Sequence, residues 1–361
     1  MRFCPSYRFL LLSLLFLAPA VVLAHEAYVL TPAEVQSGIQ IPAFNGITTA
    51  FSNLSEFVLW GFIAVLVIGI VFFISIIQPL ERLLNPLLAR GRRYAAATAR
   101  ITVGISFLAA AYYGAAYGPE LPLAVTFGAA AGAIKILLVV MGTLLIIGLY
   151  ARIVAFAALV LFGYAVYSHG AYMLTYASYL GEILVLLILG SHHGAHPRTT
   201  EALARARRHL LGLANWVEPL AKKLAPYSFA LLRICFGISL LYASLYAKIL
   251  HNNLALQVAS LPLAGHAHSL AYAFGFEPHF LVLGAAIIEI LIALFFILGI
   301  EIRFTSLFLL FWLSLSLWYF GEVVWPHVIL IGIPIAFILY GYDRYSLEGR
   351  FFKRGSREPV L

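Results

Sequence analysis

Three charged side chains lie inside long apolar segments of this chain, where a charge is costly and usually serves a function. Lys135 and Glu289 stand near the middle of their segments, and Lys248 stands near one end of another. An ionisable group in the hydrocarbon layer of a membrane typically relays a proton or contacts a polar ligand. The sequence therefore predicts that Glu289, Lys248 and Lys135 carry the chemistry that the protein performs.

Lys135 and Glu289 are expected at nearly the same depth. Lys135 precedes Gly148 by thirteen residues and Glu289 precedes Gly299 by ten, and the two glycines occupy matching places in a repeat described below. At about 1.5 Å of helical rise per residue, the two charges lie within one turn of each other. We predict that they face each other across the two halves of the protein, as an ion pair or with a shared proton. Such a pair can work as a proton relay or a quinone contact, or it can fix how the halves dock.

Lys248 and Glu182 are left without a predicted partner. Lys248 lies toward the outer end of its segment, from which its long side chain can reach the membrane surface. Only a shift of that helix would bring Lys248 to Glu289. Glu182 lies about midway along its own apolar segment and is a further buried acid.

The histidines do not form the pattern of a metal site. His251, His266, His268 and His279 fall in or beside one predicted outer loop, where a His-x-His pair could bind copper or zinc. Their spacing fixes no set of four ligands, and the loop has little acid to support them, so we predict no metal site. Haem lacks support as well, because the histidines lie at the ends of segments. The chain also has no P-loop, Rossmann glycine fingerprint, nucleophile elbow or HExxH motif.

The composition is that of a membrane protein with many spans. Of 361 residues, 63% are hydrophobic and 11% are charged, and the mean hydropathy is +0.97. The two cysteines, Cys4 and Cys235, offer no disulfide, redox pair or iron–sulfur ligation, since one lies at the start of the chain and the other in an apolar segment. The net charge of +8 is distributed as membrane orientation requires, so we expect no nucleic-acid partner.

The chain divides into a signal, an exported segment and a series of apolar helices. We predict a cleaved secretory signal at residues 1–24 and a periplasmic segment at 25–56. Residues 191–227 are expected to form a cytoplasmic linker with a basic amphipathic helix, and residues 344–361 a basic cytoplasmic tail. The nine predicted transmembrane helices lie near residues 57–79, 97–117, 123–147, 151–168, 172–190, 228–249, 278–300, 303–320 and 326–342.

The basic residues set the orientation of these helices. With the mature N-terminus outside, nine alternating helices put nearly all of the 23 Lys and Arg on the cytoplasmic side. The exceptions are two arginines in the signal, together with Lys135 and Lys248 within helices. Because cytoplasmic loops are enriched in Lys and Arg, this predicts a multi-pass protein of the inner (plasma) membrane, with a periplasmic N-terminus and a cytoplasmic C-terminus.

Much of the chain repeats itself. Matching positions at one offset are Arg100 and Arg233, Gly104 and Gly237, Leu108 and Leu241, and Tyr113 and Tyr246. At a second offset they are Gly148 and Gly299, Arg152 and Arg303, Gly170 and Gly321, Gly181 and Gly332, and Gly190 and Gly341. The sequence therefore predicts an all-α polytopic membrane protein with a leading helix at 57–79, followed by two parallel four-helix units at 97–190 and 228–343.

Four features of the second unit form a recognisable pattern. They are the Arg-x-x-x-Gly opening at Arg233 and Gly237, the lysine that closes that helix at Lys248, the glutamate of the next helix at Glu289, and the short turn from Gly299 to Arg303. In these features the stretch 228–343 resembles the DoxX family of small four-helix membrane proteins. The first unit, 97–190, is a degenerate copy, with Gly114-Ala115 in the place of the lysine and no glutamate in its second helix.

The resemblance implies a setting for the protein rather than a reaction. Members of the family are similar to membrane subunits of quinone-linked oxidoreductases, including a thiosulfate:quinone type. We therefore predict, at most, a membrane subunit of a quinone-dependent oxidoreductase, which provides a lipid-embedded quinone or proton site for a periplasmic or membrane redox partner. The alternatives are a small-solute or metal-ion transporter, favoured by the tandem units and the midplane charges, and a non-catalytic membrane scaffold for a periplasmic enzyme.

Overall fold

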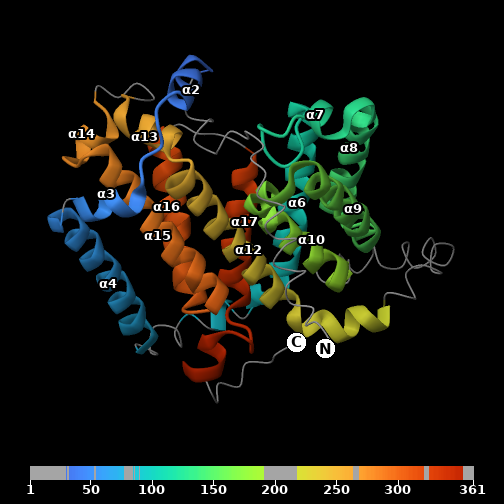
Figure 1. Ribbon diagram of the computed structural model, residues 1–361. Helices are drawn as coiled ribbons and strands as arrows, with labels where there is room; N and C mark the ends of the chain where they lie inside the picture. The colour runs from blue at the N-terminus through green and yellow to red at the C-terminus, as the bar shows by residue number, and fades with distance from the viewer. Residues whose placement is uncertain are drawn as a thin grey trace, which may run out of the picture.

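The computed structural model describes residues 30, 32–52, 54–76, 84, 86–88, 90–190, 218–262, 268–320 and 325–352. These residues form helices and one isolated β-bridge, between Ala115 and Pro122, and they contain no strand (Figure 1). The predicted signal at 1–24 lies outside the described residues, as do most of the predicted linker and the end of the predicted tail.

The first unit consists of long apolar helices joined by short turns. The long helices are α6 (Ala95–Tyr113), α8 (Ala131–Ile147), α9 (Ala151–His169) and α10 (Ala177–Leu189). The short ones are η2 (Arg92–Tyr94), α7 (Leu123–Phe127), η3 (Gly128–Ala130) and η4 (Gly170–Tyr176). Gly114 and Gly148, with φ of 69° and 85°, end α6 and α8 in the left-handed conformation that glycine adopts without strain.

The second unit has the same series of long helices with more structure between the first two. Its long helices are α12 (Ser228–Ser244), α15 (Pro278–Leu298), α16 (Ile302–Phe320) and α17 (Pro326–Tyr340). Its short ones are η6 (Ala225–Tyr227), the π-helix η7 (Leu245–Leu250), α13 (Asn253–Ser260), α14 (Leu270–Phe274) and the π-helix η8 (Glu348–Phe352). The predicted helix at 228–249 is therefore an α-helix that passes directly into a π-helix.

Before the two units, the described residues include short helical segments and the leading helix. Among them are α2 (Pro32–Ile39), α3 (Gly46–Ser52) and α4 (Leu54–Ile76). The leading helix α4 lies against α15 (Figure 1), and the indole of Trp60 fills the space that a side chain at Gly284 would need.

The helices are long and apolar enough for a membrane protein. Among the described residues, five helical stretches meet this description, namely Arg92–Tyr113, Leu123–Ile147, Ala151–Leu189, Glu218–Leu250 and Pro278–Leu298. Shorter apolar helices cover Phe57–Phe73, Ile302–Trp318 and Pro326–Tyr340. The predicted all-α polytopic membrane fold is confirmed, and each of the nine predicted segments contains a helix. That nine helices cross the bilayer stays a prediction.

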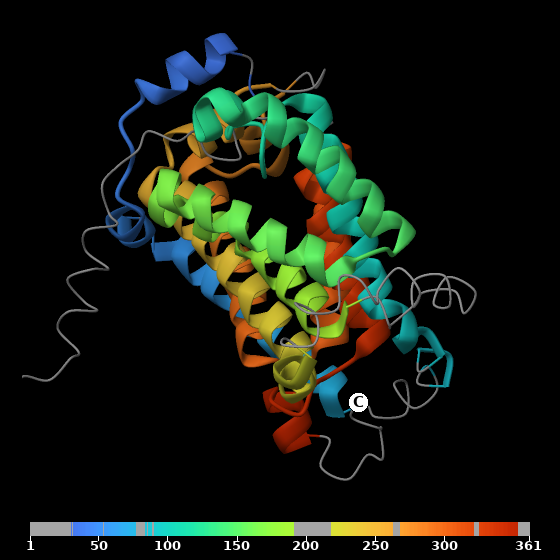
Figure 2. The ribbon, with the colours of Figure 1, turned by 90° about the vertical axis from the view of Figure 1, so that its right-hand side faces the viewer.

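The two units are interleaved. Within each unit the first helix packs on the second, α6 on α8 and α12 on α15. Across the units, the last helix of each packs on the first helix of the other, so that α10 lies beside α12 and α17 lies beside α6 (Figures 1 and 2). The second helix of each unit, α8 or α15, is thereby kept away from the contact between the units.

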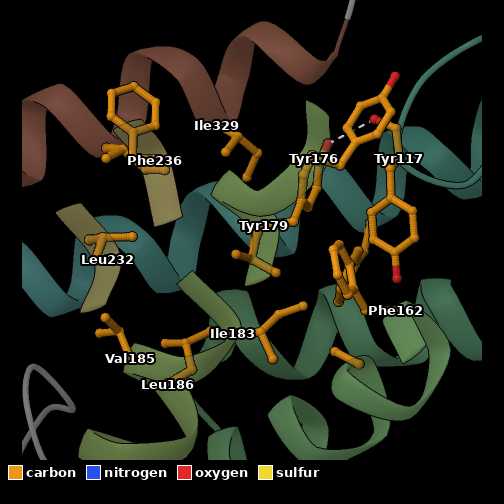
Figure 3. Close-up of a cluster of buried hydrophobic side chains, with 14 of the residues drawn as sticks. Tyr117, Phe162, Tyr176, Tyr179, Ile183, Val185, Leu186, Leu232, Phe236 and Ile329 are labelled. Atoms are coloured by element: carbon orange, nitrogen blue, oxygen red, sulfur yellow. Dashed lines mark hydrogen bonds between the residues drawn. The ribbon is translucent and has the colours of Figure 1, made fainter. Parts of the chain in front are cut away.

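One apolar core runs through both units. Figure 3 shows part of it, where Ile183 and Leu186 of α10 meet Leu232 and Phe236 of α12, with Ile329 of α17 nearby. Between apolar helices of a membrane protein, such contacts stabilise the fold through van der Waals packing. The units therefore form one packed body in the described part of the chain.

Matching glycines set the spacing of the paired helices. A Cβ at Gly237 would lie 2.6 Å from Ile297 Cγ1 and 2.8 Å from the carbonyl oxygen of Ala293, both in α15. A Cβ at Gly104 would lie 2.8 Å from Ile146 Cγ1 in α8. Positions that match in the sequence thus have similar surroundings, and each glycine lets the first helix of its unit approach the second closely.

Candidate functional site

An ion pair joins the first two helices of the second unit. The Nζ atom of Lys248, in η7, lies 2.9 Å from Oε2 of Glu289, in α15. The side chain of Lys248 is 21% exposed and that of Glu289 is 24% exposed. The pair is therefore largely buried but still open to a small polar group.

The antiparallel packing of α12 and α15 explains how Lys248 reaches Glu289. Ser244 Oγ, at the end of α12, donates a hydrogen bond of 3.4 Å to the carbonyl oxygen of Ala286 and so sets the register of the two helices. Side chains on a helix tilt toward its N-terminus. Because the helices run in opposite directions, Lys248 and Glu289 tilt toward each other.

The π-helix η7 adds to this effect. A π-turn has a wider repeat than an α-turn, so it changes the direction in which the following side chains point. Lys248 is expected from the sequence to extend toward the outer membrane surface, and in the structure it pairs with Glu289 instead. The helix shift that the sequence analysis required for this pairing is supplied by η7 and by the tilt of the side chains.

The predicted pairing of Lys135 with Glu289 is wrong. Lys135 lies on an exposed face of α8, and α8 packs on α6, within the first unit. The prediction compared depth alone, and depth does not decide which helices are neighbours. Because the units meet through α10, α12, α17 and α6, their second helices do not bring Lys135 to Glu289.

The sequence contains a signal for the correct pair. The family-like pattern has a lysine at position 248 and a glutamate at position 289, and the degenerate first unit lacks both counterparts. Two groups that are kept together in one unit and absent together from the other are expected to be partners. This comparison within the chain points to Lys248 and Glu289.

Aromatic rings cluster around Tyr246, in the same π-helix as Lys248. Tyr246, two residues before Lys248, stacks with Tyr242 and makes an edge contact with Tyr172 of the first unit, with ring centroids 5.9 and 5.4 Å apart. His251 lies on the other side of Tyr246, at a centroid distance of 4.5 Å. The helix that carries Lys248 is thus also packed through Tyr246 against η4 of the first unit.

An apolar crevice lies along another face of α15, between α4 and α16. Its lining includes Trp60 of α4, Ile287, Ile288 and Leu291 of α15, and Phe308 of α16. Its cavity volume is about 20 Å³, room for about one water molecule, so it is a shallow groove between the helices and not a deep pocket. Its walls suit a hydrocarbon chain.

The N-terminal segment is fastened just beyond η7. Asn252 is fully buried, and its side chain accepts a hydrogen bond from the Phe44 N–H at 2.9 Å and donates to the carbonyl oxygens of Phe44 and Ile249, at 2.8 and 3.2 Å. A second contact is apolar, where Leu30 and Val35 meet residues of α13. The end of η7, and with it Lys248, is thus held by a segment about two hundred residues earlier in the chain.

Arg233, which opens the family-like pattern, has a structural place. Its buried guanidinium donates from Nε to Oδ2 of Asp343 at 2.9 Å and from Nη1 to the carbonyl oxygens of Ile297, at 2.6 Å, and Phe296. These carbonyls end α15, where a cation offsets the negative end of the helix dipole. Arg233 therefore fixes α12 to α15 at the end of the bundle away from Lys248.

Three further arginines occupy comparable places at helix ends. Arg303 donates to a backbone carbonyl near the end of α17, and Arg152 does so near the end of α10, both at 3.1 Å. Arg100 lies against Gly148 at the end of α8, in contact with the space where a side chain would be. The matching arginines of the two units thus lie at the C-terminal ends of neighbouring helices.

The histidines of the outer loop do not gather into a site. His251, His268 and His279 each lie against an aromatic ring, and His266 falls outside the described residues. Within the described ranges no group of three or more His, Cys, Asp and Glu side chains could hold a metal ion.

Comparison with known proteins singles out the part of the chain that holds the ion pair. Residues 228–322 match the family model DoxX, a range that runs from α12 through α16 and includes both Lys248 and Glu289. No curated protein and no solved structure gives a match to the chain. The stretch 228–322 is therefore a DoxX domain.

Proposed function

We propose that the protein is the membrane subunit of a quinone-linked redox system, and that Lys248 and Glu289 form its lipid-embedded quinone or proton site. The observation that carries this proposal is the 2.9 Å ion pair inside the DoxX domain, between apolar helices and partly open to a ligand. Ionisable groups placed in this way are typical of proton relays and ligand sites in membranes.

The chemistry of the pair suits a quinone. Reduction of a quinone to a quinol consumes two electrons and two protons, and the quinone carbonyl oxygens accept hydrogen bonds. The ammonium group of Lys248 can donate to such an oxygen, and the carboxylate of Glu289 can hold and pass a proton. The electrons come from a partner redox protein in the membrane or the periplasm. Lys135, exposed on α8, has no part in this site as we propose it.

The crevice beside α15 supports the same proposal. Natural quinones carry a long apolar tail, and the crevice between α4, α15 and α16 offers apolar walls within the membrane. Ile288, which lines the crevice, is the neighbour of Glu289 in the chain. We place the head group at the ion pair and the tail along α15.

The orientation in the membrane follows from the charges. The arginines at the ends of α10, α15 and α17 lie at one end of the bundle, which we assign to the cytoplasm because basic residues concentrate there. The pair and Asn252 then lie toward the periplasmic side of an inner membrane.

Quinone binding to the reconstituted protein tests this function. The full chain in lipid nanodiscs is titrated with a short-chain quinone, and tryptophan quenching is followed. Glu289→Gln and Lys248→Met are expected to weaken binding by about tenfold or more, since a hydrogen bond to a charged group contributes roughly 1.5–3 kcal/mol. Lys135→Met is the matched control and should bind as the unaltered protein does.

Purification from native membranes separates the competing functions. A stoichiometric oxidoreductase partner, with quinone in the lipid extract, supports the proposal. Equal quinone affinity in all three variants would overturn it, and substrate-dependent flux in proteoliposomes without quinone would then assign transport. Release of a periplasmic enzyme on deletion of the loop 251–277, with Glu289 dispensable, would assign a scaffold.

A further inference from the structure

A second acid is buried in the other unit, apart from the Lys248–Glu289 pair. Glu182 of α10 has 0% exposure, and its Oε1 lies 2.8 Å from the hydroxyl oxygen of Thr102, in α6. Its Oε2 has no hydrogen-bond partner, and within the described part of the chain no ion pair involves Glu182. It is thus a carboxyl group deep in the fold with one weak polar neighbour.

The surroundings of Glu182 leave no place for a counter-ion. Gly332 of α17 lies directly against Thr102, and Gly181 of α10 lies against Leu232 and Cys235 of α12. The groups that lie against these glycines are small or apolar, and the titratable neighbours are the Tyr179 hydroxyl and the Cys235 thiol, neither of which is a cation. A carboxylate there would be a buried charge without a partner, which costs several kcal/mol or more.

The hydrogen-bond count at Thr102 also favours a carboxylic acid. The Thr102 hydroxyl oxygen lies 3.0 Å from each of the carbonyl oxygens of Thr98 and Ala99, in addition to its contact with Glu182. The single hydroxyl proton of Thr102 can form a good hydrogen bond to only one of these three oxygens. If Glu182 carries a proton and donates it to Thr102, the hydroxyl can donate to its own helix, and two contacts are satisfied instead of one.

A series of hydroxyl groups leads away from Glu182. One turn along both helices, the hydroxyls of Ser106 (α6) and Tyr179 (α10) lie 2.5 Å apart. The Tyr179 hydroxyl also donates to the Tyr117 carbonyl at 3.2 Å, in the turn after α6 (Figure 3). Ser106 and Tyr179 can exchange a proton with each other, because each hydroxyl can both accept and donate a hydrogen bond.

The row ends at a carboxylate near the surface. The Tyr117 ring contacts that of Tyr176, at a centroid distance of 6.2 Å, and the two rings lie together in Figure 3. The hydroxyls of Tyr176 and Tyr172 both donate to Oε1 of Glu120, the latter at 2.9 Å. Glu120 stands in the turn between α6 and α7 and is partly exposed. The polar groups thus extend from the middle of α10 to the end of the bundle that we assign to the periplasm.

We propose that Glu182 is a reversible proton-binding site, reached from the periplasmic face through the row formed by Glu120, Tyr176, Tyr179 and Ser106. A proton that reaches the Glu182 carboxylate converts it to a carboxylic acid without any transfer of electrons. This site is separate from the quinone site, lies in the unit that lacks the lysine and glutamate of the family pattern, and stands whether or not quinone binds.

Infrared spectroscopy of the full chain in lipid tests the proposal directly. A protonated carboxyl group gives a C=O stretching band apart from that of carboxylates, and the band shifts in D₂O when its proton exchanges. We expect such a band in the unaltered protein, its loss in Glu182→Gln, and its persistence in Glu289→Gln. Tyr179→Phe and Ser106→Ala should keep the band but slow its deuterium shift by about tenfold or more, which corresponds to a barrier increase of about 1.4 kcal/mol.

Further variants keep the test decisive. Ser239→Ala removes a buried hydroxyl of α12 that lies outside the row, and it should exchange at the unaltered rate. If Glu182→Gln fails to fold, Thr102→Val identifies the band, because loss of the hydrogen bond moves its frequency. Absence of a protonated carboxyl band, no response to Thr102→Val, or a band that never shifts in D₂O would each overturn the proposal. Equal exchange rates in Tyr179→Phe, Ser106→Ala and Ser239→Ala would overturn the route.

Discussion

Removal of one partner of a buried ion pair lowers the stability of a protein more than removal of both partners. Removal of Lys248 leaves the Glu289 carboxylate largely buried and uncompensated, whereas removal of both charges leaves two neutral groups of similar size. The cost of breaking a fully buried pair is about 3–5 kcal/mol. Lys248 and Glu289 are 21% and 24% exposed, so solvent and lipid head groups relieve part of that cost.

The stability of single and double variants therefore reports on the pair. We expect Lys248→Met to lower the free energy of unfolding in detergent by about 1–3 kcal/mol, and Lys248→Met with Glu289→Gln to recover most of it. Thermal unfolding followed by circular dichroism measures both. A double variant that is stable but no longer binds quinone would show that the charges serve the ligand, whereas additive losses would contradict the pairing.

The Arg233–Asp343 pair has a different role and a different expected response. Both side chains are almost fully buried, and Arg233 also serves two carbonyls of α15. Arg233→Met is expected to cost about 3–5 kcal/mol of stability, because it leaves Asp343 buried without its partner. Arg100→Met, at the matching place of the first unit, removes a guanidinium whose Nε and Nη1 have no hydrogen-bond partner, and it should cost less in the same unfolding measurement. Equal losses would argue against this difference between the units.

At the scale of helices, the site depends on how closely α12 and α15 approach. The two helices lie close together at Gly237, where a Cβ would meet Ile297 and the backbone of Ala293. Beyond this point the π-helix η7 carries Lys248 back toward Glu289. A change that separates the two helices is therefore expected to act at the ion pair as well as on stability.

Glycine substitutions test this coupling. Gly237→Ala should lower stability by about 1–3 kcal/mol, since the added methyl group meets backbone that cannot yield easily. Gly163→Ala, in the exposed middle of α9 with no atom within 4 Å of the added group, should be neutral or stabilising by about 0.5–1 kcal/mol. Unfolding in detergent measures the change in stability, and quinone titration measures the change in affinity. Unchanged quinone affinity in Gly237→Ala would mean that the spacing of α12 and α15 does not matter to the site.

At the scale of the whole molecule, the sequence predicted where the helices lie better than it predicted which helices contact each other. Apolar length and glycine positions locate helices locally, and Gly148 and Gly299 do end α8 and α15. The pairing of Lys135 with Glu289 failed because it required knowledge of which helices touch. That contact pattern, with α10 on α12 and α17 on α6, arises from packing between residues far apart in the chain.

The contact between Lys248 and Glu289 was not predicted because of the local structure of the chain. The sequence gives no mark that α12 becomes a π-helix at Leu245, and periodicity arguments assume an unbroken α-helix. The partner of Glu182 was missed because Thr102 lies in another helix and has no charge. Sequence reasoning singled out Glu289 and Glu182, and only the fold shows which side chain each one faces.

Asn252 links the N-terminal segment to the π-helix η7 that carries Lys248, and the last prediction concerns this link. Asn252 makes three hydrogen bonds, two to Phe44 and one to Ile249 at the end of η7. Each such bond contributes about 0.5–1.5 kcal/mol. Asn252→Ala should therefore free residues 41–52 and loosen η7 together.

Hydrogen exchange followed by mass spectrometry measures this coupling. In Asn252→Ala we expect faster amide exchange in both 41–52 and 245–250, and weaker quinone binding because Lys248 is less well placed. Asn253→Ala is the control, since Asn253 makes only longer contacts, of 3.3 and 3.5 Å, to Gly38 and Ile39. Faster exchange confined to 41–52 would show that the segment covers the protein without holding η7, and the geometry of the ion pair would then rest on α12 and α15 alone.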